Sequence, residues 1–398
     1  MSRKSYTLVW RAAVVLALLT LLAAPLSAFA APPVPKFPRG LKARSFASPS
    51  ANGPFEVVAS GLNNPRGLAF GPEGALYVAE AGTGGTYCIP VGPEGGPACT
   101  GPSGSVTRIN LKKGTQERVG TGLSSIADPD GSFALGPADI SFQGRGNGYV
   151  IVGLGGDPAK RDTMLGDAGP GFGQLVRMPA SGKWNYQVDV AQYEAHNNPD
   201  AGEVDSDPYA VLALSGDTAV VSDAGGNDLL RVNTRSGAIS TLAVFPDRMV
   251  DAPPFLGLPP GTQIPMQAVP TTVAVGPDGA YYVGQLTGFP FPVGAANIYR
   301  VPAGGGAPVI YASGFTNIID IAFGPDGNLY VLQIFKNGLL SGDLTGALIR
   351  VAPGGTRTEI ASDGWVTPAG VAFGPDGAIY VTNFSVFPSA GQVVKITP

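Results

Sequence analysis

The sequence has little of the chemistry on which most catalytic and metal sites depend. It contains one histidine, His196, and two cysteines, Cys88 and Cys99, in 398 residues. A structural zinc site needs about four ligands, so these three residues do not supply one. A Ser-His-Asp triad would have to use His196, which stands in a polar segment, residues 193–202, that predicts a solvated loop. No recognised catalytic motif is left.

Charged residues are also scarce, at 14% of the chain, and Lys and Arg form no cluster. Three of the 25 basic residues and none of the 29 acidic residues lie in the first thirty positions. The remainder of the chain therefore carries 22 basic against 29 acidic residues, a formal net charge of −7. A mildly acidic protein without a basic patch lacks the electrostatic footprint of a nucleic-acid-binding protein, so that class is excluded.

Long apolar runs are absent except for residues 12–26, which follow Arg3, Lys4 and Arg11 and precede Ala28-Phe29-Ala30. This arrangement is typical of a secretory signal peptide over residues 1–30. The alternative is a retained membrane anchor, but the run is shorter than the roughly 20 apolar residues that span a bilayer. We therefore predict a secreted, extracellular or periplasmic, monomeric protein with no membrane span after cleavage.

The two cysteines lie close together in a glycine-rich segment, residues 84–101. In an oxidising compartment this spacing predicts a Cys88–Cys99 disulfide that closes the loop, and the alternative is a pair of free thiols.

What the sequence has in excess is turn residues, with 58 Gly and 38 Pro beside 44% hydrophobic residues. That composition favours short strands joined by tight turns over disorder or helix. A repeated phrase bears this out: an apolar run, a Gly-Pro-Asp/Glu-Gly turn and a second apolar run that ends in a polar residue, which is typical of a β-hairpin. Its four clear copies are residues 67–80, 272–285, 320–333 and 370–383.

Two weaker copies, at residues 138–153 and 210–223, bring the number of hairpins to six. A third apolar run follows each hairpin and a fourth follows most of them. Four strands in roughly 50–60 residues are the blade of a propeller, in which sheets stack radially to bury both faces. We therefore predict an all-β, six-bladed β-propeller of four-stranded blades.

The last unit ends after its third strand, whereas an unpaired strand, residues 55–62, precedes the first hairpin. We predict that this strand pairs with residues 392–397, completes the sixth blade and protects its open edge. The expected organisation is a signal peptide over residues 1–30, an extended lead-in over 31–54 and one propeller domain over 55–398.

The phrase at residues 65–78 resembles the NHL-repeat and gluconolactonase-like six-bladed propellers. Together with the cysteine insertion and the strand at residues 101–109, the chain resembles the ScyD/ScyE family over essentially its whole mature length. This resemblance implies an exported propeller and brings no established reaction. Gluconolactonase-like enzymes hold a divalent metal with acidic and amide residues, and that resemblance implies a metal set of Glu80, Asp223 and Asn383.

Each second strand ends beside the start of the first strand of its hairpin, so polar residues there should gather on one rim of the ring. The second unit has only Gly153 and Gly155 at this place. The candidate ligand-binding residues are Arg66, Glu80, Asp139, Asp223, Gln285, Asp320, Gln333 and Asn383. Glu80, Asp139, Asp223 and Asp320 are the strongest candidates, because unpaired carboxylates near a central channel are costly unless something neutralises them.

Two interpretations of this rim remain open. The side chains converge on a small molecule, glycan or protein, or on calcium or another divalent cation, which prefers oxygen ligands. Alternatively, they cap strand ends by bonding nearby backbone amides. The favoured function is an exported binding or scaffold protein, and the alternative is a metal-dependent hydrolase or lactonase that uses the acidic rim.

Overall fold

Six blades, each built on four antiparallel strands, form the body of the protein in the computed structural model, which describes residues 55–92, 96–144 and 146–397. The expected signal peptide and lead-in lie outside these residues. In the described ranges, no helix is long and apolar enough to cross a membrane.

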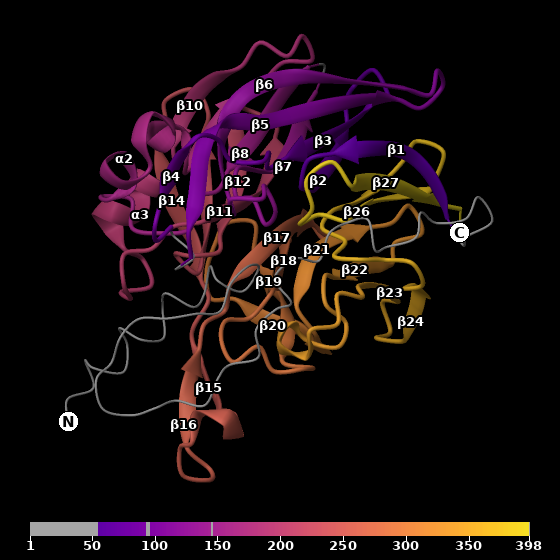
Figure 1. The fold of residues 1–398 in the computed structure, drawn as a ribbon. Coiled ribbons are helices and arrows are strands. Elements are labelled where there is room, and N and C mark those ends of the chain that lie inside the picture. Colours follow the sequence, from indigo (N-terminus) through magenta and orange to yellow (C-terminus); the bar gives the residue numbers. More distant parts are fainter. Residues whose placement is uncertain (1–54, 93–95, 145, 398) are drawn as a thin grey trace.

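The first three blades follow one another along the chain (Figure 1). Blade 1 contains β2 (Pro65–Phe70), β3 (Leu76–Glu80), β5 (Ala98–Asn110) and β6 (Thr115–Ala127). Blade 2 contains β7 (Pro137–Gln143), β8 (Asn147–Val152), β9 (Gln174–Arg177) and β10 (Asn185–Asp189). Blade 3 contains β11 (Pro208–Leu214), β12 (Thr218–Asp223), β13 (Asp228–Asn233) and β14 (Ile239–Val244).

The other three blades complete the ring. Blade 4 contains β17 (Pro270–Val275), β18 (Tyr281–Gln285), β19 (Ala296–Val301) and β20 (Val309–Phe315). Blade 5 contains β21 (Ile318–Phe323), β22 (Leu329–Gln333), β23 (Ala347–Val351) and β24 (Arg357–Ala361). Blade 6 contains β25 (Val371–Phe373), β26 (Ile379–Asn383), β27 (Gly391–Ile396) and the N-terminal strand β1 (Glu56–Leu62).

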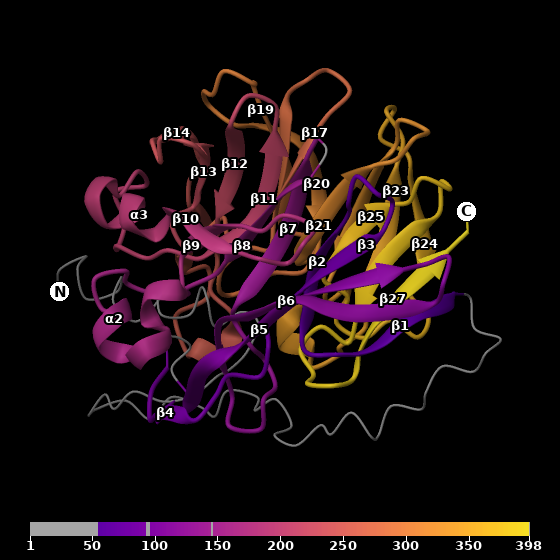
Figure 2. The same cartoon turned by 90° about the horizontal axis from the view of Figure 1, so that it is seen from above.

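The ring closes through β1, as predicted. This strand pairs antiparallel with β27, with Glu56 opposite Lys395 and Ser60 opposite Gln392. The six inner strands gather in the middle of the molecule (Figure 2), and each contacts the inner strand of the next blade, including β25 with β2. The core lies between blades, where fully buried residues such as Ile298 of blade 4 and Val331 of blade 5 share one apolar cluster.

The repeated turn has a packing reason, seen in blade 4. A Cβ at Gly276 would overlap with the ring of Tyr282, so only glycine fits at this turn position. Gly279 closes the turn with φ +76°, a conformation that glycine adopts without a steric cost. Between them, Asp278 accepts a hydrogen bond from the backbone N–H of Ala280 at 3.2 Å.

The tyrosine of each clear repeat joins its blade to the next one. Tyr282 of blade 4 packs edge-on against Phe323, the last residue of the inner strand of blade 5. Its ring thereby buries apolar area at the blade interface while its hydroxyl stays near the turn, where Asp278 accepts its hydrogen bond at 3.4 Å. The four such pairs, with ring centroids 4.7–5.2 Å apart, are Tyr77–Phe142, Tyr282–Phe323, Tyr330–Phe373 and Tyr380–Phe70.

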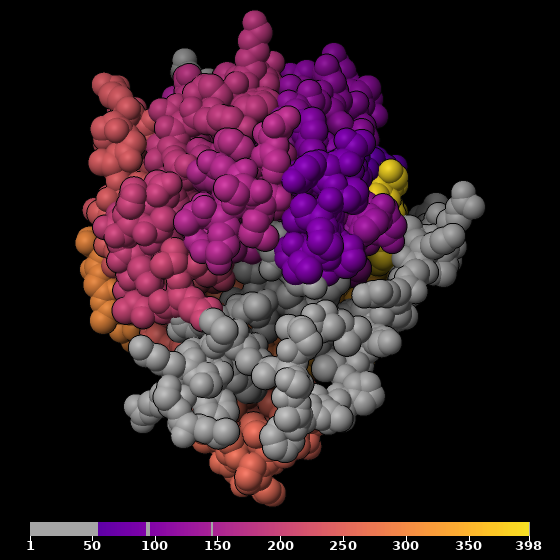
Figure 3. Space-filling view, turned by 60° about the vertical axis from the view of Figure 1, so that its left-hand side comes forward, coloured from indigo at the N-terminus to yellow at the C-terminus, as the bar shows by residue number. Residues whose placement is uncertain are grey.

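Several insertions depart from the repeat. Short helices occur after β8 and β10 and in later loops, namely α2 (Arg161–Met164), η3 (Gly166–Gly171), α3 (Ala191–Asn197), η4 (Pro254–Leu256) and η5 (Leu339–Ser341). Between blades 3 and 4, β15 (Arg248–Asp251) and β16 (Gln263–Met266) form a separate hairpin that projects from the ring (Figures 1 and 3). The sequence analysis did not predict these elements.

The disulfide between Cys88 and Cys99 is confirmed. The two residues are direct partners across β4 (Tyr87–Ile89) and the start of β5, so the bond joins two strands of a hairpin. Residues 98–101 of the glycine-rich segment belong to β5, because β5 and β6 are each thirteen residues long and extend beyond the blade.

Candidate functional site

The polar residues that end the second strands are buried. Their exposed fractions are 0–5% for Glu80, Asp223, Gln285, Gln333 and Asn383. The strand registers place them at the same end of the blades as the starts of the inner strands, because Pro65 lies opposite Glu80 and Pro208 opposite Asp223. Their position is therefore the one predicted, and their ligand role stays a prediction.

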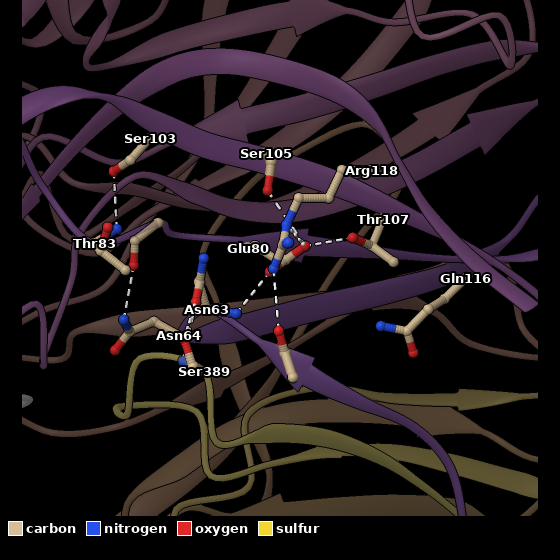
Figure 4. Close-up of polar contacts among 12 residues, drawn as sticks. Asn63, Asn64, Glu80, Thr83, Ser103, Ser105, Thr107, Gln116, Arg118 and Ser389 are labelled. Atoms are coloured by element: carbon tan, nitrogen blue, oxygen red, sulfur yellow. Dashed lines mark hydrogen bonds and ion pairs between the residues drawn. The ribbon is translucent and has the colours of Figure 1, made fainter.

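Glu80 is fully paired within its own blade (Figure 4). Its carboxylate accepts hydrogen bonds from the backbone N–H of Asn63 at 2.6 Å and from Ser105 at 3.3 Å, and also from Thr107. Arg118 of β6 forms an ion pair with it at 2.8 Å. The sequence did not reveal this ion pair, because Arg118 lies 38 residues away on a strand whose register the sequence did not define.

Three amide side chains at the same position cap nearby backbone groups. Gln285, Gln333 and Asn383 each accept a hydrogen bond from a backbone N–H through the side-chain oxygen. The donors, at 3.1, 2.7 and 2.8 Å, are Asn297, Thr316 and Val366 respectively. These contacts match the interpretation in which the polar residues cap strand ends by bonding nearby backbone amides.

Asp223 is the equivalent residue of blade 3 and accepts four hydrogen bonds. One oxygen accepts from the backbone N–H groups of Asp207 at 2.7 Å and of Gly225 and Gly226 at 3.1 Å. The other accepts from the Ser206 hydroxyl at 2.6 Å. Burial nonetheless raises the pKa of the Asp223 carboxyl, against the effect of these donors.

Asp139 and Asp320 occupy equivalent positions in the inner strands of blades 2 and 5, which are opposite each other in the ring. Each bridges to the inner strand of the following blade, because Asp139 accepts from the Val211 N–H at 2.9 Å and Asp320 from the Val371 N–H at 2.7 Å. Both side chains keep partial exposure to solvent. Of the four strongest candidates, they are the two whose side chains are not fully buried.

Burial dominates the proton affinity of this pair. It raises the pKa of Asp139 well above the usual range, and the negative charge of Asp320 raises it further. Burial also raises the pKa of Asp320 to about 6, although Val371, Thr272 and Ile321 donate hydrogen bonds that lower it. The two carboxyls therefore lie within electrostatic reach of each other and readily hold a proton.

The inner strands share an irregularity just after their first residue. In each of blades 1 to 5 the inner strand has one residue more than its partner strand there. Such a bulge re-aims the side chain of the extra residue. At this place blade 1 carries Arg66 and blade 3 carries Tyr209, both at most 6% exposed.

Arg66 and Tyr209 hold unused hydrogen-bonding capacity. The Nη2 of Arg66 donates to the Ala134 carbonyl at 2.7 Å. Within the described residues, its Nη1 and the Tyr209 hydroxyl have no hydrogen-bond partner. Burial raises the pKa of Tyr209 to about 12, with the Arg66 charge opposing and the Asp207 charge adding to this shift.

Tyr209 lies within electrostatic reach of three predicted residues, Arg66, Asp320 and Asp139, and of Asp207, because the charges of all four shift its pKa. The structure does not bring Glu80, Gln285, Gln333 or Asn383 into this group through any side-chain contact among the described residues. Sequence reasoning missed Tyr209. The signal was present, since Tyr209 follows Pro208 at the start of its inner strand just as Arg66 follows Pro65.

No group of three or more His, Cys, Asp or Glu side chains in the described ranges is arranged to hold a metal ion. Glu80, Asp223 and Asn383, the metal set implied by the family resemblance, lie in blades 1, 3 and 6 and are each bonded within their own neighbourhood. Their metal role stays a prediction.

His196 lies in α3, where a loop was expected. The helix forms because buried Ala191 and Glu194 anchor one of its faces, a tertiary effect that the local sequence does not reveal. The histidine is exposed and lies 3.3 Å from Gln192 through its Nε2 atom.

No family model and no curated protein matches the chain. A structural-genomics protein of unknown function from Bacteroides thetaiotaomicron is 10% identical, with 86% of this chain and 71% of that one covered and a TM-score of 0.50. A streptogramin B lyase is 12% identical, with 86% and 97% covered and a TM-score of 0.47. A virginiamycin B lyase from Staphylococcus aureus is 14% identical, with 86% and 98% covered and a TM-score of 0.45.

At such identities the likeness concerns the fold alone. The six blades of the structure make the chain a six-bladed β-propeller, and its narrower resemblance to the ScyD/ScyE family stays a prediction.

Proposed function

We propose that this protein is an exported binding propeller of ScyD/ScyE type that holds a small hydroxyl-rich ligand, such as a sugar or the end of a glycan, at its axis. The observation that carries the proposal is the grouping of Asp139 and Asp320 with Arg66 and Tyr209. The two carboxyls are partly exposed, and the other two residues have polar atoms without partners among the described residues.

The chemistry of this group suits hydroxyl groups. A carboxylate accepts a hydrogen bond from a hydroxyl, and a protonated carboxyl donates one. The pKa of Asp320, raised to about 6, makes both forms of that carboxyl available near neutral pH, and the raised pKa of Asp139 favours its protonated form. A hydroxyl oxygen in turn accepts from the free Arg66 Nη1 and from the Tyr209 hydroxyl, so one polyol satisfies donors and acceptors together.

Export is part of the same proposal. The signal-like N-terminus motivates it, and the Cys88–Cys99 bond supports an oxidising compartment. N-terminal sequencing of the protein recovered outside the cytoplasm tests the expected cleavage after Ala30, and an intact Met1 on that protein would contradict it.

The ligand is best found by thermal shift and calorimetry with a panel of monosaccharides, oligosaccharides and polyols, because a ligand that binds only the folded state raises its melting temperature. We expect at least one member to bind, and Asp139→Asn and Asp320→Asn each to weaken it at least tenfold. Asp376→Asn, in an exposed turn, is the matched control and should bind as the wild type does. Equal binding by all variants would place the ligand elsewhere.

The hydrolase alternative has its own test. We would measure the metal content of the purified protein and then screen lactone and ester substrates for turnover, with and without added divalent metal. Metal-dependent turnover that Glu80→Gln or Asp223→Asn abolishes would replace binding with catalysis as the function.

A further inference from the structure

A second group of acidic residues surrounds α3, at the periphery of the ring (Figure 2). Glu194 lies on α3, Asp205 in the loop that leads to β11, and Asp228 at the start of β13. Asp223 is the register partner of Asp228 across β12 and β13. This α3 cluster therefore draws on a helix, a loop and a blade.

The cluster contains oxygen atoms that are buried and have no donor. Glu194 is 2% exposed and Asp228 is 1% exposed. In the described part of the chain, the Oε1 of Glu194 and the Oδ1 atoms of Asp228, Asp205 and Asn198 have no hydrogen-bond partner. All four atoms are acceptors, so a pairing among themselves cannot satisfy them without an added proton or cation.

Glu194 and Asp223 approach each other at Gly226. A Cβ atom on Gly226 would lie 3.1 Å from the Glu194 Oε2 atom and 3.4 Å from the Asp223 carboxyl carbon. The two side chains therefore border the same small space. Burial raises the pKa of Glu194 to about 8, and the charges of Asp223, Asp200 and Asp205 raise it further. Burial and the charges of Asp223, Glu194 and Asp200 likewise raise the pKa of Asp228.

No positive side chain balances this charge. Among the ion pairs of the described residues, none includes Glu194, Asp205, Asp223 or Asp228. Asp223 already accepts four hydrogen bonds, so it adds negative potential and offers little further coordination. Buried carboxylates without a counterion are costly, and a cation removes that cost.

We propose that the α3 cluster is a site for a divalent cation of the calcium type, held by the carboxylates of Glu194, Asp205 and Asp228 and the amide oxygen of Asn198. The donors are all oxygens, which hard cations prefer. They come from elements of different kinds, and Ca²⁺ accepts such irregular, adjustable geometry better than Mg²⁺, which demands a near-ideal octahedron.

The side chains are not in place around a metal as they stand, so binding requires the carboxylates to close around the ion. The cation thereby ties α3 and the following loop to β13. None of the four proposed donors belongs to the proposed ligand site at the axis, and the proposal does not depend on that site.

Calorimetry and thermal unfolding of the chelator-treated mature protein, with CaCl₂ and with MgCl₂ as the only additions, test the proposal. We expect one Ca²⁺ per chain, a raised melting temperature, and at least tenfold weaker binding of Mg²⁺. Glu194→Gln and Asp228→Asn, which keep the side-chain volume, should each weaken Ca²⁺ binding at least tenfold. Asp139→Asn and Asp376→Asn are controls and should bind Ca²⁺ as the wild type does.

Asn198→Gly provides a variant with little risk to the fold, because Asn198 has φ +40°, which glycine tolerates. It removes the amide oxygen and should weaken Ca²⁺ binding severalfold even if the buried variants fail to fold. Wild-type protein without Ca²⁺-dependent heat or stabilisation overturns the proposal. So does Ca²⁺ affinity that Asn198→Gly and the folded carboxylate variants leave unchanged.

Discussion

Blades 1, 4, 5 and 6 differ from blades 2 and 3 in what joins neighbouring sheets. In the first group, a tyrosine of the second strand packs on a phenylalanine of the next inner strand, and a turn Asp or Glu accepts from its hydroxyl. In blade 2, Tyr149 instead donates to Thr234 of blade 3 at 3.2 Å, and blade 3 has Ala219 at this place. The two irregular blades carry Asp139, Tyr209 and the whole α3 cluster.

The repeated residues serve the interfaces between blades, whereas departures from the repeat mark candidate functional residues. In a regular blade the repeated turn residue and tyrosine satisfy each other, as with Asp326 and Tyr330. Arg66 and Asp320 are the members of regular blades 1 and 5 that belong to the proposed ligand site. Blades 2 and 3 lack the repeated turn and instead hold buried acids with raised pKa, a combination that marks candidate functional sites.

The largest expected effect comes from removing an outer strand from a regular blade. A mature protein that begins at Asn63 lacks β1 and exposes the edge of β27, so we expect aggregation or loss of cooperative unfolding. Thermal melting and light scattering measure this. A truncated protein that melts like the full-length form would contradict closure of the ring by β1.

The next effect tests the tyrosine contacts of the regular blades. Tyr330→Ala removes a buried ring from the interface with Phe373 and should lower the free energy of unfolding by about 3–5 kcal/mol. Tyr330→Phe keeps the packing, loses the bond to Asp326 and should cost about 1 kcal/mol. Chemical denaturation measures both, and equal losses would mean that packing is not the main contribution.

The disulfide tests whether the insertion in blade 1 is an independent addition to a regular blade. Replacing Cys88 and Cys99 with serine should lower the free energy of unfolding by about 3 kcal/mol, because the bond restricts a short loop in the unfolded chain. A Tyr186→Ala variant, which alters an exposed side chain of blade 2, serves as a control with little effect. Two free thiols in the unreduced exported protein would refute the bond itself.

The smallest effect concerns the pH dependence of Asp320. Its folded-state pKa, about 6, exceeds the ordinary value of 3.8, so the carboxyl favours folding most below pH 4 and loses this contribution as the pH rises to about 6. Partial exposure reduces the expected loss to about 2 kcal/mol. The free energy of unfolding of the wild type minus that of Asp320→Asn should therefore fall between pH 4 and pH 7. A difference that stays constant over this range would show an unshifted pKa.

The propeller could be predicted because its information is local and repeated. Each Gly-Pro-Asp/Glu-Gly turn specifies one hairpin through glycine conformations and a tyrosine contact that lie within a few residues, as at Gly276, Gly279 and Tyr282. Six such hairpins must stack to bury their apolar faces, which implies the ring and its closure by β1. The hairpin formed by β15 and β16 and the helix α3 have no repeat, so the same reasoning did not find them.

The sequence by itself also determined where polar residues end their strands and which two cysteines are bonded. Only the tertiary structure decided which carboxylates are neutralised. Glu80 meets Arg118 on a strand 38 residues away, whereas Asp139 meets the charge of Asp320 from the opposite side of the ring. The physical reason is that the energy of a buried charge depends on neighbours that folding brings together, and sequence distance does not report them.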